Sequence, residues 1–169
     1  IQSKEGQFYP MSQPLLEEDS NLEDVSTVFF DSNGDGFIDL LVGRGGNIPN
    51  PNDTGGSTRV YLNDGKGKFN QRVNLSLDPN TQVSVVKAID FNSDGLMDLM
   101  IGSRNLVGKY GHIPRSYLLK NLGGNEYVDV TKELAPDLEY VGMVKDAAWT
   151  DLDLDGNLDL IVVGEWMPI

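Results

Sequence analysis

The stretch Asp31-Ser-Asn-Gly-Asp-Gly-Phe-Ile-Asp39 decides the fold of this chain, because it recurs as Asp90-Phe-Asn-Ser-Asp-Gly-Leu-Met-Asp98 and Asp151-Leu-Asp-Leu-Asp-Gly-Asn-Leu-Asp159. The first residues of the copies are 59 and then 61 positions apart. A near-constant spacing of this size is typical of repeat architectures. We call the three copies the first, second and third acidic loops.

Each acidic loop carries oxygen-bearing side chains at positions 1, 3, 5 and 9. Calcium binds roughly six to eight oxygen ligands, and a glycine at position 6 allows the sharp turn that such a loop needs. Position 7 would contribute its backbone carbonyl, which suits its varied side chains. We therefore predict three Ca²⁺ sites, with the ligands Asp31, Asn33, Asp35, Phe37 and Asp39 in the first, Asp90, Asn92, Asp94, Leu96 and Asp98 in the second, and Asp151, Asp153, Asp155, Asn157 and Asp159 in the third.

The residues after each loop exclude an EF-hand, which needs a glutamate at position 12 and a following helix. Position 12 is Val42, Ile101 or Val162 instead, inside a short apolar run that ends at glycine and is typical of a buried strand. Magnesium stays open as an alternative, although it demands tighter geometry. Zinc is disfavoured because the chain has one histidine and no cysteine.

Further short strands surround each loop, and together they define a repeat unit. A strand is expected before each loop and another directly after it, and a third and a fourth strand are joined by an Asn/Gly-rich turn. Four antiparallel strands in about 60 residues predict the blade of a β-propeller, and hence an all-β fold. We expect about eleven strands, and helical turns only near Glu17 and Lys132. The strands expected around the loops are 26–30, 40–43, 59–62, 84–89, 99–102, 116–119, 145–150 and 160–164, with fourth strands that start at Phe69 and Tyr127.

The repeat divides the chain, taken as one propeller segment over 1–169, into four parts. Residues 1–22 are expected to supply an outer strand of a preceding blade, 23–78 and 79–138 a blade each, and 139–169 the first half of a blade. Propellers close with roughly four to eight blades. We therefore expect an incomplete propeller that is part of a larger one or that self-associates.

Composition limits the classes of partner. The net charge is −13, and ten of the 26 acidic residues lie in the acidic loops, so three calcium ions would leave about −7. No basic patch is present to neutralise phosphates, which disfavours nucleic acid. No apolar run approaches the roughly 20 residues of a membrane span.

The three acidic loops resemble FG-GAP/VCBS-type repeats. The turn Tyr61-Leu-Asn-Asp-Gly-Lys-Gly-Lys-Phe69 shares this resemblance. Gly142-Met-Val-Lys-Asp-Ala-Ala-Trp-Thr-Asp151 and Gly164-Glu-Trp-Met-Pro168 are similar, more narrowly, to cartilage-acidic-protein-like (ASPIC/UnbV-associated) bacterial proteins. The resemblance implies a calcium-bearing propeller in which the metals join the first two strands of each blade. It also implies export, which suits the calcium affinity of about 10⁻⁴–10⁻³ M found in extracellular modules.

The sequence indicates the function of the protein less closely than it indicates the fold. We expect a structural scaffold that binds a protein or glycan ligand, because no catalytic constellation is visible. An enzyme similar to a polysaccharide lyase would need His112 and Arg104 or Arg115 to converge beside a metal, and a lectin would need a pocket between blades. Both alternatives stay open, because propellers host unrelated functions.

Overall fold

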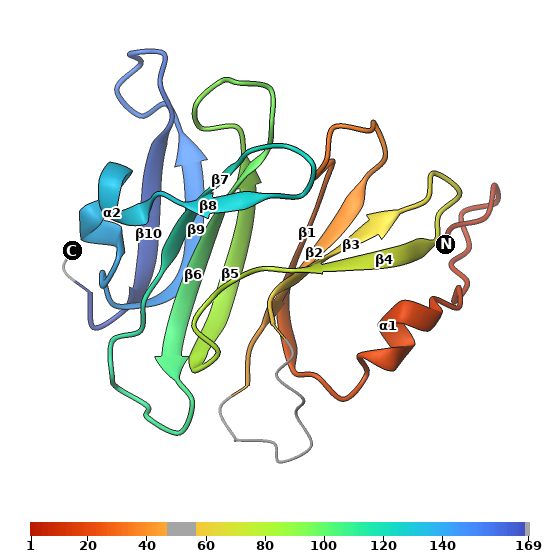
Figure 1. Cartoon of the computed structure of the whole chain (residues 1–169), viewed down its shortest axis with the longest axis horizontal. Helices are drawn as coiled ribbons and strands as arrows, with labels where there is room; N and C mark the ends of the chain where they lie inside the picture. Colours follow the sequence, from red (N-terminus) through yellow and green to blue (C-terminus); the bar gives the residue numbers. More distant parts are fainter. Residues whose placement is uncertain (47–56, 168–169) are drawn as a thin grey trace.

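The computed structural model describes residues 1–46 and 57–167. It is all-β, with sheets fanned side by side as in a partial propeller (Figure 1). The first blade has the strand order β1-β2-β3-β4 and the second blade β5-β6-β7-β8, and β9 and β10 form a two-stranded half-blade. Every neighbouring pair of strands is antiparallel. The strands are β1 (Asp24–Phe30), β2 (Asp39–Arg44), β3 (Arg59–Asn63), β4 (Phe69–Asn74), β5 (Thr81–Ile89), β6 (Asp98–Leu106), β7 (Tyr117–Asn121), β8 (Tyr127–Asp129), β9 (Met143–Thr150) and β10 (Asp159–Glu165).

The helices are short, and the two α-helices lie where helical turns were expected, whereas the 3₁₀ turn was not predicted. They are α1 (Pro14–Glu18), α2 (Thr131–Leu134) and the 3₁₀ turn η1 (Pro136–Leu138). No helix in residues 1–46 and 57–167 has the length and apolar character needed to cross a membrane.

Ten strands are described where about eleven were expected. The segment that begins at Phe8 makes a single antiparallel bridge with Gln2 and continues to α1. Its turn nevertheless resembles the β3–β4 turn, because Ser3 N donates to Gln7 O at 2.7 Å as Asp64 N donates to Lys68 O at 2.9 Å. The register of the repeat thus extends to the N-terminal residues.

Two apolar cores lie between neighbouring sheets. The larger one joins the first and second blades, and the smaller one joins the second blade to the half-blade. Gly43 and Gly102, near the ends of the two apolar runs, lie where the next sheet comes closest. A Cβ atom on Gly43 would lie 2.9 Å from Val83 Cγ1, and one on Gly102 would lie 2.6 Å from Val144 Cγ1. The glycine that ends these runs therefore lets one blade approach the next.

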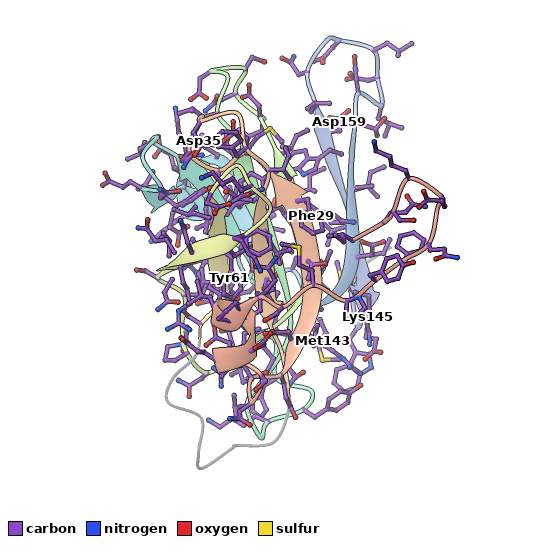
Figure 2. The ribbon with its side chains drawn as sticks, turned by 90° about the vertical axis from the view of Figure 1, so that its right-hand side faces the viewer. Phe29, Asp35, Tyr61, Met143, Lys145 and Asp159 are labelled. Atoms are coloured by element: carbon purple, nitrogen blue, oxygen red, sulfur yellow. The ribbon has the colours of Figure 1, made fainter. Side chains whose placement is uncertain are left out.

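The three acidic loops lie together at one rim of the fan, at the top of Figure 1. Each one joins the first strand of a blade to the second. The second strands β2, β6 and β10 end at the opposite rim. Figure 2 shows the same separation, with Asp35 and Asp159 near the upper rim and Lys145 well below them.

Candidate metal centre

The first aspartate organises each acidic loop by accepting backbone hydrogen bonds. Asp31 accepts from Gly34 N and Gly36 N, both at 2.8 Å. Asp90 accepts from Gly95 N at 2.8 Å, and Asp151 accepts from Gly156 N at 3.0 Å. The carboxylate at position 1 therefore lies inside the curled loop, where a ligand of a central cation must lie.

Two positions of each loop adopt left-handed backbone conformations. The glycine at position 6 has φ of 85° in the first loop, 87° in the second and 91° in the third. Position 4 is also left-handed, and it is occupied by Gly34 (80°), Ser93 (58°) and Leu154 (62°). The three loops therefore share one backbone path even where a non-glycine residue must adopt an unfavourable φ.

The ninth aspartate ties the start of the loop to the strands. Asp39 accepts from Ser32 N at 3.0 Å and from Asn63 N at 2.8 Å, and Asp98 accepts from Asn121 N at 2.8 Å. Asp39 and Asp98 are fully buried. Asp159 is exposed, because the half-blade has no third strand to cover it in the described residues.

The third loop brings three carboxylates together. Oxygens of Asp151, Asp153 and Asp159 all lie within 4.8 Å of one another, and they form the one such acidic or histidine-containing group found in residues 1–46 and 57–167. Asp155, at position 5, is outside this group, since it accepts from Asn157 N at 2.7 Å and from Asn157 Nδ2 at 3.0 Å. Positions 1, 3 and 9 thus converge, whereas the ligand role predicted for position 5 stays a prediction.

In the first two loops, the side chain at position 7 covers the turn between the third and fourth strands, whereas in the third loop Asn157 Nδ2 donates to Asp155 Oδ2. Phe37 lies against Gly65, and Leu96 lies near Gly123. Phe37 is 46% exposed. Its side chain therefore points away from the loop, as expected if position 7 offers only its carbonyl.

Electrostatics differ between positions 5 and 9. Backbone hydrogen bonds from Leu96 and Asn157 are the main cause that lowers the pKa of Asp94 and Asp155, respectively. Burial raises the pKa of Asp98, with a further contribution from the charges of Asp94 and Asp90. A cation beside Asp98 would offset both effects.

The chemistry of the donors fits a hard cation. Carboxylate and amide oxygens line each loop, and none of the three contains cysteine or histidine. Calcium and magnesium prefer oxygen, and calcium tolerates the wider range of geometries. The residues that would hold the ion are those at positions 1, 3 and 9, with position 5 and the position-7 carbonyl as further ligands.

Arg59, the first residue of β3, is a buried structural residue. Its guanidinium is 1% exposed and pairs with both carboxylate oxygens of Asp24, at 3.0 and 2.8 Å, and with Asp19 at 3.2 Å. Tyr61 donates to Asp19, and burial, followed by this bond, raises the pKa of Tyr61 to about 12. Arg72 also bonds Asp19, so this cluster fixes the segment after α1 to the first blade.

His112 and Arg115, weighed as catalytic candidates, have different surroundings. His112 is exposed. Arg115 pairs with Asp129 at 2.6 Å and with Glu139 at 2.9 Å, so its charge is already used. Arg104 instead lines a cavity of about 410 Å³ between the sheets, away from the acidic loops, together with Gln82 and Lys145.

Comparison with known proteins identifies the repeat. A family model described as an FG-GAP-like repeat matches residues 31–101, from the start of the first acidic loop into β6. No curated protein and no solved structure matched the chain. This region therefore contains an FG-GAP-like repeat, within a fold of propeller-type blades.

Proposed function

We propose that this chain is a calcium-binding propeller module of an exported protein, which serves as a scaffold for binding a protein or a glycan. The observation that carries the proposal is the shared design of the three acidic loops. In each one, the first aspartate accepts from the glycine at position 6, and the ninth accepts from the residue at position 2. The convergence of three carboxylates in the third loop supports the same reading.

The metals would be structural. Without a cation, each loop holds three or four aspartates close together, and their mutual repulsion opposes folding. A bound Ca²⁺ would remove this repulsion and hold the first and second strands of each blade in register. Export is proposed because modules of this class bind calcium at about 10⁻⁴–10⁻³ M, a concentration typical of extracellular fluid. The narrower similarity to ASPIC/UnbV-associated proteins agrees with export and stays a prediction.

The rim opposite the acidic loops is the proposed ligand face. The cavity there is lined by Arg104 and Lys145, and the buried Gln82 Oε1 has no hydrogen-bond partner in the described residues. Lys145 pairs with Glu165 at 2.8 Å, so it is the guanidinium of Arg104, which lies over the Tyr110 ring, that favours a ligand with a carboxylate or sulfate group. The same observation favours a lectin for acidic glycans as the second candidate function.

The two outer faces of the fan would contact further blades or another copy of the chain. Val25 and Phe29 of β1 are 50% and 64% exposed, and Ile161 and Val163 of β10 are 41% and 54% exposed. The equivalent faces between described blades are buried in apolar cores. Exposed apolar faces of this kind mark interaction surfaces.

Unfolding in calcium and in EDTA tests the metal part of the proposal. A ligand that binds only the folded protein adds about 2.7 kcal/mol per site at a hundredfold excess over its Kd. We expect calcium to raise the midpoint of thermal unfolding strongly, and magnesium to raise it less. Equal midpoints in calcium and EDTA would refute the proposal.

Stoichiometry by isothermal titration calorimetry assigns the ligands. We expect Asp151→Ala to lower the number of bound calcium ions by one and Asp137→Ala, an exposed aspartate outside the loops, to leave it unchanged. Asp35→Ala, Asp94→Ala and Asp155→Ala test position 5 in the three loops. Full stoichiometry in these three variants would remove position 5 from the ligand set.

A further inference from the structure

Asn121, the last residue of β7, joins the first acidic loop to the second. Its Nδ2 donates to Ser32 O at 2.9 Å in the first loop and to Met97 O at 3.0 Å in the second. Its backbone N donates to Asp98 Oδ1, and its Oδ1 accepts from Gly123 N at 2.9 Å. The side chain is 1% exposed, so water cannot readily replace these bonds.

A second contact between the blades reinforces this bridge. The Ser32 hydroxyl, which is fully buried, donates to Asp39 Oδ2 at 2.5 Å and lies 3.1 Å from the side-chain amide of Asn125. Asn125 belongs to the β7–β8 turn of the second blade and has a left-handed φ of 69°. The closing aspartate of the first loop is therefore connected, through Ser32, to the neighbouring blade.

Asn63 holds the corresponding place in the first blade and provides an internal comparison. It makes the same contacts within its own blade, because its N donates to Asp39 Oδ1 at 2.8 Å and its Nδ2 donates to Ile38 O at 2.9 Å. Within the described residues, its amide reaches no second loop. Asn63 thus contacts one acidic loop, whereas Asn121 contacts two.

The third loop lacks such a bridge. All side-chain hydrogen bonds of Asp151–Asp159 in the described part of the chain stay within that loop. The three loops therefore divide into a bridged pair and a separate one.

We propose that Asn121 couples the first two acidic loops, so that calcium in either one raises the affinity of the other, while the third loop binds independently. The proposal rests on calcium binding as proposed above. Its physical basis is that Asn121 can bond Ser32 O and Met97 O together only when both loops are closed. Calcium that orders one loop then removes part of the entropy cost of ordering the other, and the effect is reciprocal.

Glycine amides allow each loop to be followed separately. Gly36, Gly95 and Gly156 donate to the first aspartate of their own loops, so their resonances in [¹⁵N]glycine-labelled protein report calcium in each. The experiment titrates calcium into the full chain, with the second loop intact and with it disabled by Asp90→Asn. We expect disabling the second loop to weaken binding in the first by about fivefold or more, and to leave the third unchanged.

Variants of the bridge then test the route of coupling. In an Asn121→Ala background, disabling the second loop should change the affinity of the first by less than about twofold. Asn63→Ala is the matched control, because it should weaken the first loop while the coupling persists. Asn125→Gly accepts the left-handed φ and removes only the Ser32 contact, so it should reduce the coupling partway.

The outcomes separate the two proposals. If calcium shifts none of the three glycine resonances, both calcium binding and coupling are wrong. If the first loop binds equally with the second loop intact or disabled, coupling alone is overturned. Coupling that survives undiminished in Asn121→Ala would refute the role of Asn121. If Asn121→Ala does not fold, Asn121→Ser takes its place, because it also removes the Nδ2 donor to Ser32 O and Met97 O, and undiminished coupling in it has the same meaning.

Discussion

Replacing Gly102 with alanine will test how closely the second blade packs on the half-blade. The added Cβ would lie 2.6 Å from Val144 Cγ1 and 2.6 Å from Val85 Cγ1. Carbon atoms in van der Waals contact lie roughly 3.5–4.0 Å apart, so both contacts are too short. Val144 and Val85 are buried and β-branched, and they cannot turn aside without straining χ1.

Overpacking a core costs about 1–3 kcal/mol, and we expect Gly102→Ala near the upper end because two stiff side chains oppose the methyl group. Gly43→Ala should lie near the lower end, since its Cβ would meet Val83 and Val86 at 2.9 and 3.0 Å. Urea denaturation, at fixed calcium and protein concentrations, measures both. The denaturation midpoint should fall while the dependence on urea concentration stays the same.

The double variant Gly102→Ala/Val144→Ala supplies the control. Truncating Val144 makes room for the new methyl group, so the double variant should lose less stability than the two single losses together. Additive losses, or a change of less than about 0.5 kcal/mol in Gly102→Ala alone, would refute the proposed contact.

Three further predictions concern single side chains. Leu154→Asn should stabilise the protein by about 0.5–1 kcal/mol in thermal unfolding, because asparagine tolerates the left-handed φ that leucine adopts only with backbone strain. A loss of stability in this variant would contradict backbone strain at Leu154. Burial opposes ionisation of Asp19, but hydrogen bonds from Arg72 and Tyr61 and the charge of Arg59 outweigh burial and lower the pKa of Asp19. The resulting stabilisation of the folded state is present above the unfolded pKa of about 3.9 and is lost as pH falls through the folded pKa. Asp19→Asn should therefore flatten the acid limb of the stability curve. An unchanged acid limb would show that Asp19 is not the group that titrates. Lys120 Nζ lies 3.4 Å from Asp94 Oδ2 and would repel a cation there, so calorimetry should find that Lys120→Gln tightens calcium binding in the second loop by about fivefold and leaves the third loop unchanged.

Strand positions could be predicted from the sequence because local patterns determine them. The apolar run after each acidic loop ends at glycine, and the expected strand 40–43 lies within β2 (Asp39–Arg44). The same holds for 99–102 within β6 and 160–164 within β10. A repeated loop with adjacent apolar residues leaves few alternatives for a chain that must bury those residues against a neighbouring sheet.

Contacts between distant residues could not be predicted in the same way. The sequence indicates the charge of Arg59, but its partner Asp19 is 40 residues away and meets it only because α1 packs beside the first blade. An asparagine at position 121 is typical of a turn. Its bond to the first acidic loop could not be predicted, because that loop belongs to the neighbouring blade. A left-handed φ at position 4 of the loops can be predicted from the sequence where the residue is glycine, as at Gly34, but not where it is leucine, as at Leu154.

The separation of the two rims has a consequence for how such a protein can diversify. β2 (Asp39–Arg44) and β6 (Asp98–Leu106) begin at an acidic loop and end at the opposite rim, about 20–30 Å away at the usual rise per residue. Insertions between the second and third strands therefore extend the far rim without altering the spacing of the acidic residues within any one loop. New surface chemistry can accumulate at one end of each sheet while the elements that hold the sheet together remain constant at the other.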